Sequence, residues 1–155
     1  NVFNYADVFQ VPVIHMMDKF IASSVTTCQR FDETKVNIDR GKLLDEPPSN
    51  AYKRFEHTAD GLSPRSKIGL ENGIFWNTGD ESDVEGHISE DPVNRVEMMD
   101  KRQSRLDYIL EKIPESEQIV KHSDGEFCVV SWGSTQGPIL DAIDMLKNEG
   151  INIVG

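Results

Sequence analysis

One turn in the sequence combines residue types that bind phosphate groups. Residues 132–138 read WGSTQGP, and this turn carries Gly133, Ser134, Thr135 and Gly137. The first turn of a helix presents free backbone N–H groups and a partial positive charge, which suit an anion. Two glycines between a strand and a helix are also what a tight corner requires. The turn therefore predicts either an anion or coenzyme contact or a simple change of chain direction.

A second group of chemistry-bearing residues lies in the acidic segment EGHISEDP, residues 85–92. His87 lies near Glu90 and Asp91, a combination that could transfer protons or hold a cation. The structural alternative makes Asp91, which precedes Pro92, the N-cap of a helix. His87 would then pack or hydrogen-bond at a junction. The sequence leaves both interpretations open.

A third candidate is the basic pair of the segment SPRSK, Arg65 and Lys67. A guanidinium beside a proline could bind a phosphate or a carboxylate. Alternatively, the pair fixes its own loop to an acidic neighbour. We group Arg65 with His87, Glu90 and Asp91 as candidate residues of a junction or interface.

Other signatures of catalysis are missing from the sequence. It contains neither of the phosphate-binding motifs GxxxxGKS/T and GxGxxG, and no paired-carboxylate or Ser/His/Asp arrangement. Cys28 and Cys128 stand alone, without metal-site spacing. Cys128 lies in an apolar run, so we expect its thiol to be buried. We predict no catalytic residue and no metal ligand in this chain.

Periodicity predicts the elements that position these residues. Asp91 and Pro92 mark the start of a long helix that Pro114 ends. Residues 126–155 predict a strand, a helix and a second strand, and hence parallel strands joined by a right-handed crossover. The apolar stripe of the long helix comprises Val96, Met99, Leu106, Leu110 and Ile113.

The first half of the chain gives weaker signals. The run VPVIHMM, residues 11–17, predicts a strand buried on both faces, and Asp18 is placed to cap a following helix. Residues 30–67 are polar, carry three prolines and predict an extended linker with short edge strands at 36–38 and 52–56. Two strands and one helix cannot bury a full core, and the chain lacks an initiator Met, so we expect a fragment.

The composition limits the classes of partner that the chain could bind. The net charge is −11 and the isoelectric point about 4.7, which disfavours nucleic acid and anionic membranes as partners. No apolar run approaches the roughly 20 residues that span a bilayer. The two isolated cysteines favour a cytoplasmic location. We predict no nucleic acid and no membrane partner.

Four segments resemble a known family. They are PVIHMMDKFIASS, YKRFEHTADGLSPRSKIG, GDESDVEGHISEDPVNRVEMMDKRQSRLDYI and VVSWGSTQGPILDAIDMLKNEGINIV. In this order they resemble the α subunit of 2-oxoacid:ferredoxin oxidoreductases, and GHISEDP followed by MMDKR is the most specific part. Phe55 and Leu62 replace the Tyr and Ile of the family pattern, and Ser82 stands where a histidine is usual.

The resemblance implies an α/β fold. It places residues 1–31 at the end of a pyrimidine-type thiamine domain and residues 32–124 in an extended linker, acidic loop and long helix. Residues 125–155 would open a domain like the transketolase C-terminal domain, with a partial parallel-sheet β-α-β unit. The turn at 133–137 would then be a corner of that sheet, although coenzyme A binds somewhere near the domain junctions of the family.

The resemblance also implies an activity, namely oxidative decarboxylation of a 2-oxoacid to acyl-coenzyme A with reduction of ferredoxin. The parent complex would use thiamine diphosphate, Mg²⁺, a 4Fe–4S cluster and coenzyme A, none of which this fragment is expected to bind. Its partners would be the β subunit, the remainder of the α subunit and, through the complex, ferredoxin. The alternatives are a stand-alone α/β module for protein interaction or phosphate ligands, and a fragment of a pyruvate dehydrogenase E1 β-type enzyme.

Overall fold

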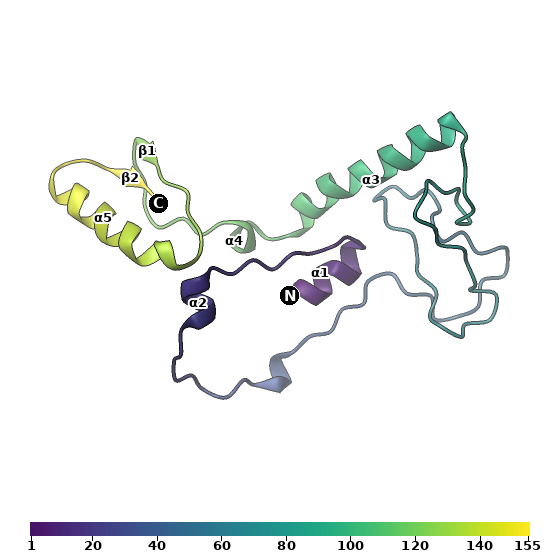
Figure 1. Ribbon diagram of the computed structural model, residues 1–155, viewed down its shortest axis with the longest axis horizontal. Coiled ribbons are helices and arrows are strands. Elements are labelled where there is room, and N and C mark those ends of the chain that lie inside the picture. The colour runs from purple at the N-terminus through teal and green to yellow at the C-terminus, as the bar shows by residue number, and fades with distance from the viewer. The chain divides into compact units, whose positions relative to one another are not determined.

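Contacts within the computed structural model divide the chain into two compact units (Figure 1). The structure describes residues 1–155, apart from the side chain of Val154. Unit 1 comprises Asn1–Ile14 and Val36–Ile113, and unit 2 comprises His15–Lys35 and Pro114–Gly155. The chain therefore enters unit 2, returns to unit 1 and ends in unit 2. The predicted domain boundaries near residues 31 and 124 stay a prediction about the parent subunit.

Unit 1 packs two helices against a long irregular segment. Helix α1 spans Val2–Phe9 and ends at Gln10, whose φ of 52° is left-handed. Helix α3 spans Pro92–Lys112. The ring of Phe9 meets Tyr108 edge-on, with 6.2 Å between centroids. Isolated bridges between 43 and 65 and between 82 and 88 order the intervening loops. The buried apolar side chains are Phe9, Leu62 and Met98.

Helix α3 forms where the sequence predicts it. The Asp91 side chain accepts the Val93 N–H at 3.0 Å, and Pro92 begins the helix. The residues of α3 that are buried within unit 1 are Met98 and Lys101, neither of which belongs to the apolar stripe. The predicted stripe points away from that packing, and Leu106 and Leu110 are 54% and 63% exposed.

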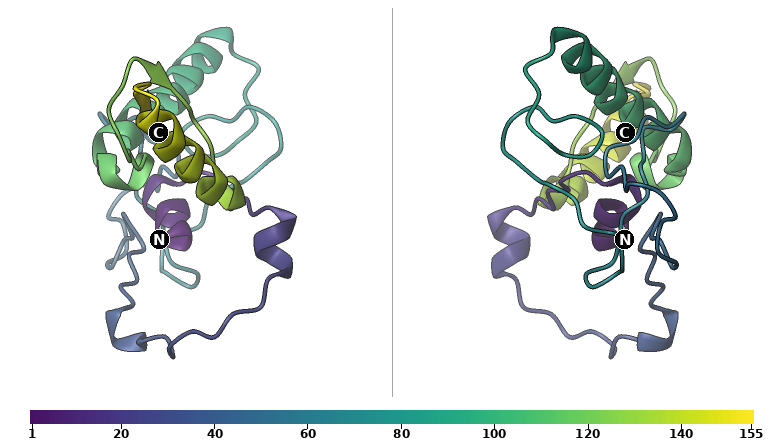
Figure 2. Two further views of the ribbon diagram at one scale, coloured as in Figure 1. Left: turned by 90° about the vertical axis from the view of Figure 1, so that its left-hand side faces the viewer. Right: turned by 90° about the vertical axis from the view of Figure 1, so that its right-hand side faces the viewer.

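Unit 2 contains the predicted strand–helix–strand unit. Strands β1, Phe127–Cys128, and β2, Ile153–Val154, pair in parallel, with Phe127 opposite Ile153. Helix α5, Gln136–Asn148, connects them and lies beside them (Figures 1 and 2). The short elements are α2 at Lys19–Ser23, α4 at Glu115–Gln118, and 3₁₀ turns η1 at Glu33–Lys35 and η2 at Gly133–Thr135.

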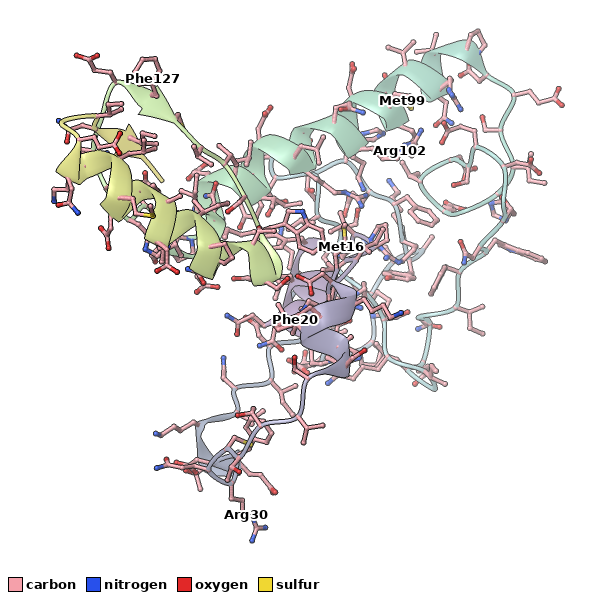
Figure 3. The ribbon with its side chains drawn as sticks, turned by 60° about the vertical axis from the view of Figure 1, so that its left-hand side comes forward. Met16, Phe20, Arg30, Met99, Arg102 and Phe127 are labelled. Carbon is pink, nitrogen blue, oxygen red and sulfur yellow. The ribbon has the colours of Figure 1, made fainter. Side chains whose placement is uncertain are left out.

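Three expectations about strands are wrong. Residues 11–17, 36–38 and 52–56 form no strand in the structure, and β1 and β2 have two residues each. A strand needs a hydrogen-bonded neighbour, and an apolar run alone does not supply one. The Cys128 thiol is exposed rather than buried, because nothing in unit 2 covers that part of β1. Phe20 on α2 and Phe127 on β1 are also exposed, and both are labelled in Figure 3.

Candidate functional site

The turn before α5 is closed around a carboxylate of the chain itself. Asp18 Oδ2 accepts the backbone N–H of Ser134 at 2.6 Å. Asp18 Oδ1 accepts the backbone N–H of Ile21 at 2.9 Å, which makes Asp18 the N-cap of α2 as predicted. Gly133 has φ of 69°, and a Cβ on it would overlap the Asp18 carboxylate. One side chain thus joins two segments 116 residues apart in sequence.

These contacts stabilise the ionised form of Asp18. The hydrogen bond from Ile21, followed by those from Ser134, lowers the pKa of the Asp18 carboxyl below its usual value. A turn that suits an anion therefore already holds one at its Ser134 N–H. The sequence identified Asp18 only as a helix cap, because no local sequence pattern indicates a partner as distant as Ser134.

The other predicted residues of this turn have different surroundings. The Thr135 hydroxyl donates to the Trp132 carbonyl oxygen at 2.9 Å. Gly137 lies in the first turn of α5, with open space where a Cβ would be. A pocket of about 510 Å³ adjoins the turn and has His122, Trp132 and Gln136 in its lining. A ligand contact of the turn stays a prediction, and Gly133 and Ser134 are the two residues that close on Asp18.

The acidic loop is organised by Asp83. Its Oδ1 accepts the backbone N–H groups of Glu85, Gly86 and His87 at 2.9, 2.9 and 3.0 Å. His87 Nδ1 lies 3.7 Å from Asp83 Oδ2, and the His87 ring lies against Trp76 with 5.8 Å between centroids. Desolvation works against the ionised carboxyl, but these backbone donors and His87 outweigh it and lower the pKa of Asp83.

The four candidate junction residues do not form one cluster. His87 lines a pocket of about 610 Å³ together with Tyr52, Phe75 and Trp76, among other residues. Arg65 instead pairs with Asp7 of α1 at 2.9 Å, and also donates to the Arg40 carbonyl oxygen. Asp91 caps α3, and Glu90 beside it is exposed.

An ion pair that sequence reasoning missed fixes the acidic loop to α3. Arg102 donates to both carboxylate oxygens of Glu81, at 2.9 and 2.7 Å, and Arg95 donates to Glu81 Oε2 at 3.1 Å. Arg102 extends from α3 beside Met99 (Figure 3). The bond from Arg102 is the largest cause of the lowered pKa of Glu81. Spacing gives no signal for this pair, because loop conformation decides it.

The side chains present do not fit a metal or a cluster. Within the described part of the chain, no group of three His, Cys, Asp or Glu side chains is placed to hold a metal ion. The thiols of Cys28 and Cys128 are both free and exposed. We therefore derive no step through Mg²⁺ or an iron–sulfur cluster on these residues. Among the described residues, no helix has both the length and the hydropathy to span a bilayer.

Comparisons with known proteins agree with the motifs. The sequence model of the family described as "Pyruvate flavodoxin/ferredoxin oxidoreductase, thiamine diP-bdg" matches residues 1–101. The chain is 48% identical over 153 residues to subunit alpha of 2-oxoacid:ferredoxin oxidoreductase 2 of Aeropyrum pernix. It is 40% identical to subunit alpha of oxidoreductase 1 of that organism. These matches cover 96% and 97% of this chain, but 23% and 24% of the relatives.

A solved structure is similar to this chain. The 2-oxoglutarate:ferredoxin oxidoreductase of Magnetococcus marinus, with 2-oxoglutarate, coenzyme A and succinyl-CoA bound, superposes with a TM-score of 0.80 at 28% identity. The match covers 97% of this chain and 26% of that one. The chain thus spans about a quarter of the length of the proteins that it matches. It belongs to the pyruvate flavodoxin/ferredoxin oxidoreductase thiamine diphosphate-binding family, and its resemblance to 2-oxoacid:ferredoxin oxidoreductase α subunits is confirmed.

Proposed function

We propose that the chain is a scaffold and interface segment of an α subunit whose enzyme decarboxylates 2-oxoacids oxidatively, forming acyl-coenzyme A and reducing ferredoxin. The observation that carries this proposal is the 48% identity to such a subunit along almost the whole chain. The parent complex would bring thiamine diphosphate, Mg²⁺, a 4Fe–4S cluster and coenzyme A, and its β subunit would be the principal partner. The cytoplasmic location stays a prediction.

The surface of the chain supports an interface role. Its accessible surface is 12274 Å². A folded monomer of 17.5 kDa exposes roughly 7,900 Å². The excess includes the apolar stripe of α3, where Val96, Leu106 and Leu110 are exposed. Contiguous exposed apolar side chains with a polar border mark protein interfaces. By helical geometry the border on one side of the stripe is acidic and contains Glu97, Asp100, Asp107 and Glu111.

The two alternatives have less support. A stand-alone phosphate-binding module would use the turn at Gly133 and Ser134, but Asp18 already accepts the Ser134 N–H. A second carboxylate or a phosphate there would face the charge of Asp18. A pyruvate dehydrogenase E1 β-type fragment is disfavoured because the matching relatives are ferredoxin-dependent.

Activity assays of the intact assembly test the proposal. The complete α subunit, purified with its β subunit, is expected to reduce ferredoxin when both a 2-oxoacid and coenzyme A are present. Omitting either substrate should abolish the reduction, and residues 1–155 alone should show none. Turnover by the isolated chain, or an assembly that reduces no ferredoxin with pyruvate, 2-oxoglutarate or 2-oxobutyrate, would contradict the proposal.

The stripe on α3 gives a more local prediction. Changing both Leu106 and Leu110 to Ser should weaken the assembly tenfold to a hundredfold or lower its inactivation temperature by several degrees. The reason is that truncating the two interface side chains together is expected to cost about 1.4–2.7 kcal/mol, which corresponds to that factor. Affinity can be measured with labelled β subunit, and inactivation by residual activity after heating.

A matched control uses the neighbouring face of the same helix. Changing Asp107 and Glu111 to Ser alters two exposed residues without removing apolar contact area. This control should have a much smaller effect, because border charges contribute little to affinity. Wild-type affinity and heat resistance in the leucine variant would show that the stripe stays in water within the assembly.

A further inference from the structure

The apolar stripe of α3 has the spacing of a helix that packs along another helix. Its members are separated alternately by three and four residues, once Gln103 is counted as the polar member of the series. The series is Val96, Met99, Gln103, Leu106, Leu110 and Ile113. A strict alternation of three and four is the heptad pattern, which keeps a narrow apolar line facing a partner helix. A helix that covers a globular core usually presents a wider apolar face.

Unit 1 covers a different side of α3. The buried residues of the helix are Met98 and Lys101, and by helical geometry both lie well away from the stripe. Val96 is 59% exposed, and Leu106 and Leu110 are exposed to a similar extent. Unit 1 therefore does not supply the partner helix that the heptad pattern indicates.

Gln103 makes the stripe selective. It is exposed and lies near the middle of the series. Its amide can both donate and accept hydrogen bonds, so burying it against an apolar surface would cost free energy. A polar residue at such a position favours one register, because it needs a polar group opposite it. The stripe thus suits a specific helix better than a general apolar surface.

The two borders of the stripe differ in charge. Asp100 and Asp107 each follow a member of the series, whereas Arg95 and Arg102 each precede one. In a heptad these flanking positions lie beside the partner helix. Both arginines already bind Glu81. Within the described part of the chain neither aspartate forms an ion pair, and both are exposed. One border therefore offers two uncompensated negative charges to a partner.

We propose that a helix of the β subunit packs along this stripe, with a polar residue facing Gln103 and basic side chains facing Asp100 and Asp107. The inference rests on the proposed function, in which the β subunit is the principal partner. A second copy of this chain fits less well. An antiparallel pair of copies would bring their aspartates together, and a parallel pair would set the aspartates against arginines that Glu81 already holds.

The kinetics of association between the complete α subunit and labelled β subunit test the charges. Asp100→Lys combined with Asp107→Lys should slow association tenfold or more at low salt, because like charges would then face each other. The difference should shrink as salt is added. Both positions are exposed on a helix, where lysine is a good helix former, so the variant should fold.

A matched control changes the net charge by the same amount outside α3. Glu46→Lys combined with Glu71→Lys alters two exposed residues of unit 1. This control should slow association much less, because neither position borders the stripe. The comparison separates local contact with the partner helix from the effect of overall charge.

Gln103→Leu tests the polar group on the partner helix. The change makes the stripe more apolar, yet it should weaken binding about tenfold, because the polar group opposite residue 103 loses its hydrogen bond. Carbodiimide treatment of the wild-type assembly, followed by mass spectrometry, should link Asp100 or Asp107 to a lysine of one β-subunit helix. Slowed association of the lysine variant without such a link identifies the basic groups as arginines, which carbodiimide does not couple.

Three results would overturn the proposal. Equal association rates in the two charge variants would exclude basic side chains opposite the aspartates. Tighter binding by Gln103→Leu would exclude a polar group opposite residue 103. A link from either aspartate to the remainder of the α subunit, or to a second α subunit, would identify a different occupant. Each of these results is compatible with ferredoxin reduction, whereas an assembly that associates normally without reducing ferredoxin contradicts only the proposed function.

Discussion

Replacing Gly86 by alanine is expected to unfold the acidic loop locally, at a cost of about 3 kcal/mol or more. Gly86 has φ of 97°, which an L-residue rarely adopts, and its Cβ would overlap the Trp76 carbonyl oxygen. The obstacle is backbone, so no side chain can move aside. The loop would have to shift, and the contact of His87 with Trp76 would be lost with it.

Hydrogen–deuterium exchange of the intact subunit, followed by mass spectrometry, can measure this effect. Peptides covering residues 76–90 should exchange more than a hundredfold faster in Gly86→Ala, since about 3 kcal/mol corresponds to that factor. Gly79→Ala is the matched control in the same loop, because a Cβ there meets nothing within 4 Å and its φ is not positive. Equal protection of these peptides in the two variants would contradict the prediction that a Cβ at residue 86 destabilises the loop.

The second large effect is expected from Gly133→Ala, at about 2–3 kcal/mol. The left-handed φ of 69° is strained in any L-residue, and the new Cβ would displace the Asp18 carboxylate. Asp18 would then lose the Ser134 N–H, and that donor would be left without its acceptor. The change therefore loosens both η2 and the start of α2, although only η2 carries the substitution.

Gly137→Ala, four residues along the chain, is the control for this prediction. A Cβ there has open space, and alanine inside a helix is favoured over glycine by about 0.5–1 kcal/mol. Exchange in peptides covering residues 18–24 should accelerate about thirtyfold or more in Gly133→Ala and stay unchanged in Gly137→Ala. Unchanged exchange of those peptides in both variants would show that the Asp18 contact does not hold α2.

Elements specified by neighbouring residues could be predicted from the sequence. Asp91 and Pro92 determine where α3 begins, because a cap acts within one helical turn. The parallel pairing of β1 and β2 follows from their connection through α5. The pattern could not show which face of α3 is covered within the chain. It identified the stripe at Val96 and Leu106 as apolar, but it did not show that Met98 and Lys101 are the residues covered within the chain.

Contacts between distant segments could not be predicted from the sequence for a related reason. The bond from Ser134 to Asp18 and the pair of Arg102 with Glu81 depend on where loops bring residues together. Charge and residue type at each position were visible, but many acidic residues were equivalent candidates in a chain with a net charge of −11. The prediction of a strand at residues 11–17 was wrong because the composition of the run fits a strand, whereas strand formation also needs a hydrogen-bonded neighbouring strand from elsewhere in the chain.

The return of the chain to unit 2 has a consequence for biosynthesis. When a ribosome has just added Asp18, the Ser134 that it binds is still 116 residues from being made. At about 5–20 residues per second, that interval lasts roughly 6–23 s. During it, Asp18 can cap α2 through the Ile21 N–H, but it has no Ser134 N–H to accept. We therefore expect the contact between α2 and η2 to form late in synthesis, after α2 has been capped.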